Sequence, residues 1–266
     1  TMVSVKEDGV KEGFAKVAEL GLHTCQMTCT AEVMLDKLNP KEIRKIADEA
    51  GVRITSFFLL FEGQIFNKTE GPACMGFIPE KHRERRLELA KKFSDMVREM
   101  GVDSITSHVG FIPNDSKHPD YVGFLPIMRS FIKHCEKNGQ TFCFETGQEL
   151  PSTLKRTIHD LDCKNVFINL DPANVILYGM AYPLDAVEIF GEYIRGMHAK
   201  DGTWPIGNIQ MGVEVPVGEG EVNFPLVMAK VKEKGFKGPL TIEREIKGPQ
   251  QKADILRAIE FLKPLI

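Results

Sequence analysis

Short apolar segments alternate along the chain with longer segments of helical period. In residues 79–100, for example, Leu87, Ala90, Phe93 and Val97 recur at helical spacing, and Lys and Arg occupy the opposite face. Several short segments are apolar on both faces, which is typical of strands buried in a parallel sheet. The pattern predicts eight strands, at Val3–Val5, Thr24–Thr28, Arg53–Leu60, Ser104–His108, Thr141–Glu145, Val166–Asp171, Ile194–His198 and Leu240–Glu243.

Glycine follows several predicted helices and precedes the next strand. Three of these junctions, ELGLHTCQM, EAGVRITSF and EMGVDSITS, share the order helix, glycine, one apolar residue and strand, so the chain repeats an αβ unit. Glycine tolerates the positive φ of a left-handed helix cap, which explains its position. The glycines predicted to end helices are Gly21, Gly51, Gly101, Gly139 and Gly235.

Eight strands in 266 residues leave about 33 residues for each unit, the size of a βα pair. We therefore predict an α/β fold, a single (β/α)₈ TIM barrel in which residues 1–266 form one catalytic domain. A doubly wound open sheet is the alternative. Its nucleotide-binding versions lose support because no GxGxxG follows the first strand and no GxxxxGK[ST] occurs. Segments 63–79 and 202–222 are predicted to be loops over an active site.

The composition is that of a globular protein, with 42% hydrophobic and 27% charged residues. The net charge of −3 provides no general attraction for nucleic acid or an anionic membrane. The longest apolar run, residues 54–61, is far shorter than the roughly 20 residues that span a bilayer. We therefore expect neither nucleic acid nor membrane as a partner.

The six cysteines form no CxxC pair and no zinc-finger spacing. We interpret them as free thiols, mostly buried, which weakly favours a reducing compartment. A cytoplasmic location is therefore expected, although an export signal removed upstream of Thr1 remains an alternative.

Ionisable residues terminate four consecutive predicted strands. The segments TFCFE, VFINLD, IRGMH and PLTIE end at Glu145, Asp171, His198 and Glu243, which are 26, 27 and 45 residues apart. In a barrel these positions are equivalent, at the C-terminal face where TIM-barrel active sites lie. We expect the four side chains to converge.

Three carboxylates and one imidazole are a suitable ligand set for one divalent metal ion. Hard oxygen ligands with one nitrogen favour Mn²⁺, Mg²⁺ or Co²⁺ and tolerate Zn²⁺. A single carboxylate at a strand end is more often a helix cap or half of an ion pair. Four such residues in register favour the metal site.

The segments CFETGQE, INLDPANVILYG, MHAKDG, VGEGEVNF and LTIERE resemble the sugar phosphate isomerase/epimerase family. These xylose isomerase-like TIM barrels include ketose 3-epimerases, hydroxypyruvate isomerases, inosose dehydratases and, more distantly, endonuclease IV. The resemblance implies that Glu145, Asp171, His198 and Glu243 bind one catalytic metal. It also implies that Glu145 and Glu243 transfer protons, and that the substrate is a small sugar or sugar phosphate.

That chemistry explains the residue types. Isomerising or epimerising a sugar requires removal of a weakly acidic proton beside the carbonyl, and a metal bound to the sugar oxygens stabilises the resulting enediolate. Two carboxylates can then remove and return the proton. The same residues serve an isomerase and an epimerase, so the sequence does not separate the two.

Five further residues are candidates for substrate binding, each with a plainer alternative: His108, Lys200, Asn174, Glu219 and Trp204. His108 is otherwise a buried histidine bonded to a carbonyl, and Lys200 a surface lysine. Asn174 is otherwise a partner of the next helix backbone. Glu219, in the segment VGEGEV, is otherwise a turn residue. Trp204 either stacks on a sugar or packs within its loop.

Three rival functions remain. A dehydratase also begins with proton abstraction beside a carbonyl at a metal. An endonuclease IV-like phosphodiesterase uses three zinc ions and many histidines, but Asn174 stands where that branch has a metal-binding histidine. Ketose 3-epimerases also often carry a histidine there, so Asn174 argues against a direct transfer of their sugar specificity. A non-catalytic sugar- or metal-binding barrel is the third rival. Such barrels often form homo-oligomers, and no interface is evident in the sequence.

Overall fold

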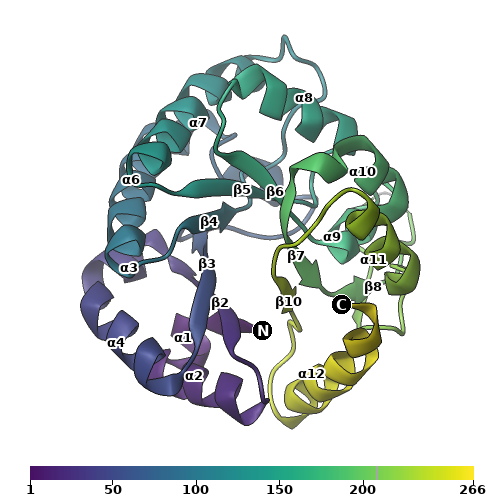
Figure 1. The fold of residues 1–266 in the computed structure, drawn as a ribbon. Helices are drawn as coiled ribbons and strands as arrows, with labels where there is room; N and C mark the ends of the chain where they lie inside the picture. Colours follow the sequence, from purple (N-terminus) through teal and green to yellow (C-terminus); the bar gives the residue numbers. More distant parts are fainter. Residues whose placement is uncertain (208) are drawn as a thin grey trace.

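A computed structural model describes residues 1–207 and 209–266, and its centre is a ring of eight parallel strands (Figure 1). The strands follow one another in chain order, from β1 through β7 to β10, without the reversal that a doubly wound sheet requires. The predicted (β/α)₈ barrel is therefore confirmed. Its strands are β1 (Met2–Ser4), β2 (Thr24–Thr30), β3 (Arg53–Leu60), β4 (Ser104–Ser107), β5 (Thr141–Glu145), β6 (Val166–Leu170), β7 (Ile194–Ala199) and β10 (Leu240–Ile242).

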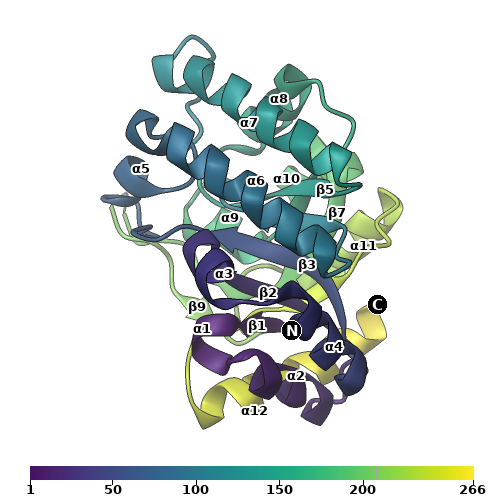
Figure 2. The ribbon, with the colours of Figure 1, turned by 90° about the vertical axis from the view of Figure 1, so that its left-hand side faces the viewer.

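Helices surround the ring of strands, and α6 and α7 run side by side on its outside (Figure 2). The α-helices are α1 (Val5–Asp8), α2 (Val10–Glu19), α3 (Ala31–Lys37), α4 (Pro40–Ala50), α5 (Gly71–Cys74), α6 (Arg83–Glu99), α7 (Pro119–Lys137), α8 (Pro151–Leu161), α9 (Pro172–Leu177), α10 (Pro183–Phe190), α11 (Phe224–Glu233) and α12 (Pro249–Leu262). Three 3₁₀ helices are η1 (Glu80–His82), η2 (Gly191–Tyr193) and η3 (Lys263–Leu265).

Helix α4 shows how local sequence sets these elements. The Asn39 side chain accepts hydrogen bonds from the backbone N–H groups of Lys41 and Glu42, which caps the helix start. Gly51 ends the helix with φ 64°, in the left-handed region predicted from its position. The apolar face of the helix buries Ile43 and Ala47 in the core.

The two predicted loops contain small elements that the pattern did not predict. Segment 63–79 includes α5. Segment 202–222 includes β9 (Glu214–Val215), which pairs in antiparallel orientation with β8 (Asp201–Gly202) at the start of the segment. Two-residue strands are too short to show a hydrophobic period, so only the pairing of their backbones identifies them.

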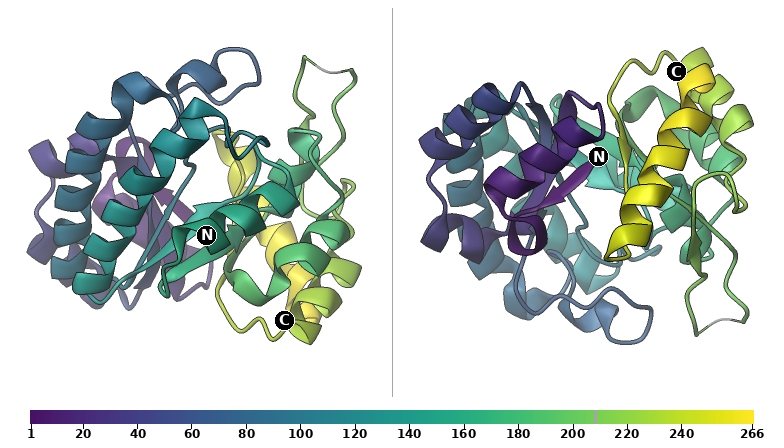
Figure 3. Two further views of the ribbon diagram at one scale, coloured as in Figure 1. Left: turned by 90° about the horizontal axis from the view of Figure 1, so that it is seen from above. Right: turned by 90° about the horizontal axis from the view of Figure 1, so that it is seen from below.

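The barrel is nearly closed. Among the described residues, no backbone ladder joins β1 to β10, and instead the Thr1 hydroxyl donates a hydrogen bond to the carbonyl of Ile242, at 2.9 Å. Across the same seam Lys16 donates to the Gln251 side chain at 2.8 Å. The view from below in Figure 3 shows α12 in yellow beside the purple N-terminal segment.

The remaining predictions from composition can be compared with the structure. In the described part of the chain, no helix has both the length and the apolar character to cross a membrane. The six cysteines are free, as predicted; four are buried, whereas Cys74 and Cys163 are partly exposed.

Candidate metal centre

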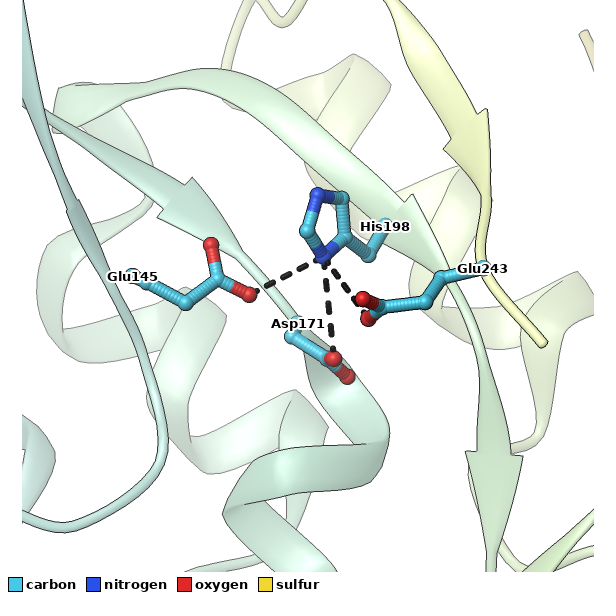
Figure 4. Close-up of side chains that lie close together, drawn as sticks. All are labelled: Glu145, Asp171, His198 and Glu243. Carbon is cyan, nitrogen blue, oxygen red and sulfur yellow. Dashed lines mark ion pairs between the residues drawn. The ribbon is translucent and has the colours of Figure 1, made fainter. Parts of the chain in front are cut away.

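The four predicted metal ligands converge at the C-terminal end of the barrel (Figure 4). Glu145 ends β5, Asp171 follows β6, His198 lies in β7 and Glu243 follows β10. One ligand atom from each residue lies within 4.8 Å of the others. Within residues 1–207 and 209–266, this is the one cluster of His, Cys, Asp and Glu side chains with the geometry to hold a metal ion.

The imidazole Nδ1 of His198 lies at the centre of the cluster. It is 3.0 Å from Glu145 Oε1, 3.2 Å from Glu243 Oε2 and 3.7 Å from Asp171 Oδ2. The Nδ1 atom, Glu145 Oε1 and Asp171 Oδ2 are buried and make no well-aligned hydrogen bond. Because buried polar atoms are nearly always hydrogen-bonded, such a convergence requires an explanation. A divalent cation bound by these atoms provides one.

In His198, Glu145 and Asp171 the second polar atom of the side chain is held by the protein. His198 Nε2 lies 2.6 Å from Gln26 Oε1, and the Gln26 amide nitrogen lies 3.4 Å from Thr106 Oγ1. With the glutamine oriented in this way, His198 donates its Nε2 proton and leaves the Nδ1 lone pair for a metal.

The carboxylates follow the same rule. Asn169 donates a hydrogen bond to Glu145 Oε2 at 2.6 Å, which leaves Oε1 facing His198. Asp171 Oδ1 accepts the backbone N–H of Asn174 at 2.9 Å, capping α9, and leaves Oδ2 facing the cluster. In Glu145 and Asp171, one oxygen is therefore fixed and the other is presented to the centre, whereas in Glu243 the same oxygen, Oε2, faces both His198 and Lys200.

The charges of the cluster shift its pKa values in different directions. Burial raises the pKa of Glu145 to about 7. Burial also opposes ionisation of Glu243, but the positive charges of Lys200 and His198 outweigh it and lower the pKa of Glu243. Burial would lower the pKa of His198, yet the charges of Glu145 and Glu243 raise it well above its usual value. The centre therefore favours a positive charge at Nδ1, as a proton or as a metal ion.

Lys200 is 2% exposed, so it is not the surface lysine of the alternative interpretation. Its ammonium donates to Glu245 Oε1 at 2.7 Å, Asn174 Oδ1 at 3.3 Å and Glu243 Oε2 at 3.4 Å. These contacts hold Glu243 in place and account for the presence of a buried lysine.

A cavity of about 330 Å³ opens beside the metal centre. His108, with Nδ1 3.1 Å from Gln148 Oε1, lies on its wall, and burial lowers the pKa of His108 to about 3, so the ring is neutral. Of the five predicted substrate-binding residues, this cavity includes His108, Asn174 and Lys200. The other lining residues are Met2, Thr28, Phe58, Leu60, Phe66, Leu177, Tyr178, Met211, Glu243 and Glu245.

The structure does not bring Glu219 and Trp204 to this cavity. Glu219 is exposed and pairs with Arg257 at 3.0 Å, while the backbone N–H groups of Gly218 and Gly220 on either side of it bind Asp201. Trp204 packs against Tyr182, with ring centroids 4.9 Å apart, as the loop-packing alternative expects.

The segment VGEGEV stabilises a buried carboxylate. It wraps the buried carboxylate of Asp201, which accepts hydrogen bonds from the backbone N–H groups of Gly202, Gly218, Gly220 and Val222 at 2.9–3.1 Å. A side chain at Gly220 would overlap the Asp201 carboxylate. The glycines thus allow the backbone of this segment to approach the Asp201 carboxylate closely.

Gln26 and Asn169 were not among the predicted site residues. Both are polar residues inside otherwise apolar strand segments, CQM and INL, which is the signal that could have identified them. Gly196 on the neighbouring strand makes room for Asn169, because a Cβ there would overlap the Asn169 side-chain oxygen.

Residues 14–265 match the family described as Xylose isomerase-like TIM barrel. The chain belongs to this family, as the sequence segments predicted. A crystal structure of a xylose isomerase domain protein from Planctomyces limnophilus is 32% identical, with a TM-score of 0.93 over 100% of this chain and 95% of that one.

Two more distant structures share the fold. D-psicose 3-epimerase from Clostridium cellulolyticum H10, solved with D-tagatose, is 14% identical, with a TM-score of 0.74 over 99% of this chain and 98% of that one. A xylose isomerase-like TIM barrel protein from Mycobacterium smegmatis in complex with magnesium is 17% identical. Its TM-score is 0.70 over 96% of this chain and 87% of that one.

Proposed function

We propose that the protein is a divalent-metal-dependent sugar isomerase or epimerase that transfers a proton beside a carbonyl through an enediolate. The observation that carries the proposal is the buried convergence of His198 Nδ1, Glu145 Oε1 and Asp171 Oδ2, which lack a well-aligned hydrogen bond, together with Glu243. The fold and its structural neighbours, which include sugar 3-epimerases, support an enzyme of the isomerase class.

The proposed ligands of a single metal ion are Glu145, Asp171, His198 and Glu243. Three oxygen ligands and one nitrogen suit Mn²⁺, Mg²⁺ or Co²⁺, with Zn²⁺ as a further option, and a structural neighbour was solved with magnesium. When bound, the ion polarises the sugar carbonyl and stabilises the negative charge of the enediolate.

Glu145 and Glu243 are the proposed proton-transfer pair. They lie on either side of the His198 imidazole, on β5 and after β10, so they can face opposite sides of a bound sugar (Figure 4). For epimerisation, one carboxylate removes the proton and the other returns one to the opposite face. Burial keeps the pKa of Glu145 near neutrality, which suits a group that must both accept and release a proton.

His108, Lys200 and Asn174 are the proposed substrate contacts, since each lines the cavity beside the metal centre. The neutral ring of His108 can exchange hydrogen bonds with sugar hydroxyls. Lys200 fixes Glu243 and is the one cation on this wall, so it also stabilises an oxyanion of the substrate.

Deuterium exchange tests the proposal. The protein is supplied with Mn²⁺ and incubated with a panel of ketoses in D₂O, and the sugars are examined by NMR. We expect one bound metal ion per chain and deuterium at a carbon beside the carbonyl. Loss of a hydroxyl would support the dehydratase instead. Absence of exchange on every sugar, with three metal ions and cleavage of abasic DNA, would support the nuclease.

A further inference from the structure

A second and larger hollow adjoins the metal cavity at the ends of β2 and β3. Its volume is about 810 Å³, compared with about 330 Å³ for the metal cavity. The two hollows share Thr28, Leu60 and Phe66 as wall residues. A molecule that begins at Glu243 and is too long for the metal cavity can therefore extend past these side chains into the second hollow, which we call the side pocket.

The chemistry of the side pocket differs from that of a sugar site. Its inner wall is mostly apolar, and all of its charged residues are exposed at the rim. The apolar wall residues are Val5, Cys29, Val33, Leu38, Leu60, Phe61 and Phe66. The charged rim residues are Lys6, Glu7, Lys37 and Glu62. The lining also has four uncharged polar side chains, Ser4, Thr28, Thr30 and Gln64. The Ser4 and Thr30 oxygens accept backbone N–H groups, whereas Thr28 Oγ1 and Gln64 Nε2 make no hydrogen bond with the described residues. Sugar hydroxyls or a phosphate would therefore have fewer contacts there than an apolar group, which would be removed from water.

Phe66 marks the passage between the two hollows. Its side chain is 42% exposed, which is unusual for a phenylalanine, and its ring centroid lies 5.5 Å from that of His108. An exposed aromatic face beside a binding cavity offers a stacking surface for an apolar or aromatic group.

The hollow along the β1–β10 seam offers a polar route out of the same cavity, but its groups already bind one another. Lys16 there contacts Asp8 at 3.2 Å and the Gln251 oxygen at 2.8 Å. The apolar wall of the side pocket has no comparable partner among the described residues. A ligand in the seam hollow would therefore compete with existing polar contacts, whereas an apolar ligand in the side pocket would not.

We infer that the substrate is a sugar that carries an apolar substituent at the end remote from its carbonyl. The sugar binds at the metal centre, and the substituent fills the side pocket beyond Phe66. The position of the sugar rests on the proposed function, whereas the apolar substituent rests on the volume and lining of the side pocket. A free monosaccharide would leave the larger hollow without a ligand.

Calorimetric binding to the Mn²⁺-supplied protein tests the inference. The probes are ketohexoses in three forms: unsubstituted, as the 6-O-benzyl ether and as the 6-phosphate. We expect each bound ketose to gain at least about tenfold in affinity from the benzyl group, because its ring leaves water in the side pocket. No gain, no binding of any benzyl ether, or tighter binding of the 6-phosphate than of the benzyl ether would overturn the inference. Failure of the proposed function has a separate sign, the absence of deuterium uptake from every ketose.

A matched pair of variants locates the substituent. Val33 on α3 lines the side pocket but not the metal cavity. Val122 on α7 is 56% exposed and lines neither hollow. V33E should reduce the benzyl gain to less than about twofold, since a carboxylate then faces the ring, and V122E should keep it. L38E is the second variant if V33E does not fold. A full benzyl gain in the folded V33E or L38E protein would show that the ring binds elsewhere.

Discussion

Buried carboxylates at the same end of the barrel differ in how many of their oxygens accept hydrogen bonds. Asp201 accepts four backbone hydrogen bonds, so both of its oxygens are satisfied. Glu145 and Asp171 each have one oxygen fixed by the protein and one that faces His198 without a hydrogen bond. Since burial alone does not distinguish them, the hydrogen-bond partners separate a structural acid from a ligand.

The difference has an energetic reason. A satisfied carboxylate contributes to folding, because the N–H groups that bind it would otherwise be buried without an acceptor. Three carboxylates that share one centre repel each other, and Lys200 and His198 compensate part of their charge. The geometry of the candidate metal centre therefore favours binding of a further cation, whereas the Asp201 loop stabilises the fold.

The largest effect is expected from E145Q. The amide keeps the shape of the side chain but cannot accept a proton, so deuterium exchange into the substrate should fall at least about a thousandfold. Exchange is measured by NMR with the Mn²⁺-supplied protein. E219Q, which removes an exposed carboxylate outside the cavity, is the control and should keep the wild-type rate. Equal rates for E145Q and the wild type would contradict the proton-transfer role.

The second prediction compares D201N with D171N in the metal-free protein. In D201N one oxygen becomes an NH₂ group that faces backbone donors, so the free energy of unfolding should fall by about 3 kcal/mol. In D171N the remaining oxygen still caps α9, so the loss should be about 1 kcal/mol or less. Urea denaturation followed by circular dichroism gives both values. If D171N lost more free energy of unfolding than D201N, the structural role assigned to Asp201 would be wrong.

Metal affinity should depend on Gln26, which contacts the candidate metal centre through His198 Nε2, the ring nitrogen that faces away from the cluster. Q26L removes the acceptor for Nε2–H and with it the preference for the tautomer with a free Nδ1 lone pair. We expect Mn²⁺ binding to weaken about 10- to 100-fold. Calorimetry measures the dissociation constant, and Q26E, which restores an acceptor, should recover much of it. If Q26L bound Mn²⁺ with wild-type affinity, Gln26 would not contribute to metal binding.

The smallest effect concerns Asp254, a hydrogen-bonded acid that is not part of the candidate metal centre. Arg244, Arg257 and Gln250 donate to Asp254 at 2.7–2.8 Å, and although burial opposes ionisation, these contacts lower the pKa of Asp254 from 3.8 to about 2. Because the folded pKa is below the unfolded one, this stability is present above about pH 4 and is lost as the pH falls. Between pH 7 and pH 3, the wild type should lose about 1 kcal/mol more than D254N. Urea titrations at both pH values measure the difference, and an equal loss in the two proteins would contradict it.

Much of the fold was predictable because its signal is local. Seven of the eight predicted barrel strands begin at the predicted residue, from Thr24 to Leu240, since buried parallel strands are recognisable as apolar runs bounded by helix caps. The convergence of the four candidate metal ligands was predictable because each residue ends such a run. The pair β8 and β9 was not, since two residues are too few to form a period.

The substrate-binding predictions show where local reasoning stops. Glu219 and Trp204 lie in a long loop, and nothing in the spacing of loop residues determines which way a side chain points. Gln26 was not predictable as a site residue, because a single glutamine in a strand gives no sign of its partner. His198, its partner, is 172 residues away in the chain and comes beside it only in the folded barrel.

The eight βα units and the residue types at the strand ends follow from local sequence, because hydrophobic period, glycine caps and terminal polar residues act over a few neighbouring positions. Three properties follow only from the folded barrel: which atoms of those residues lack a hydrogen bond, how Lys200 holds Glu243, and where the side pocket opens. Those properties depend on distances between residues far apart in the chain, and they are set only when the strands close into a ring.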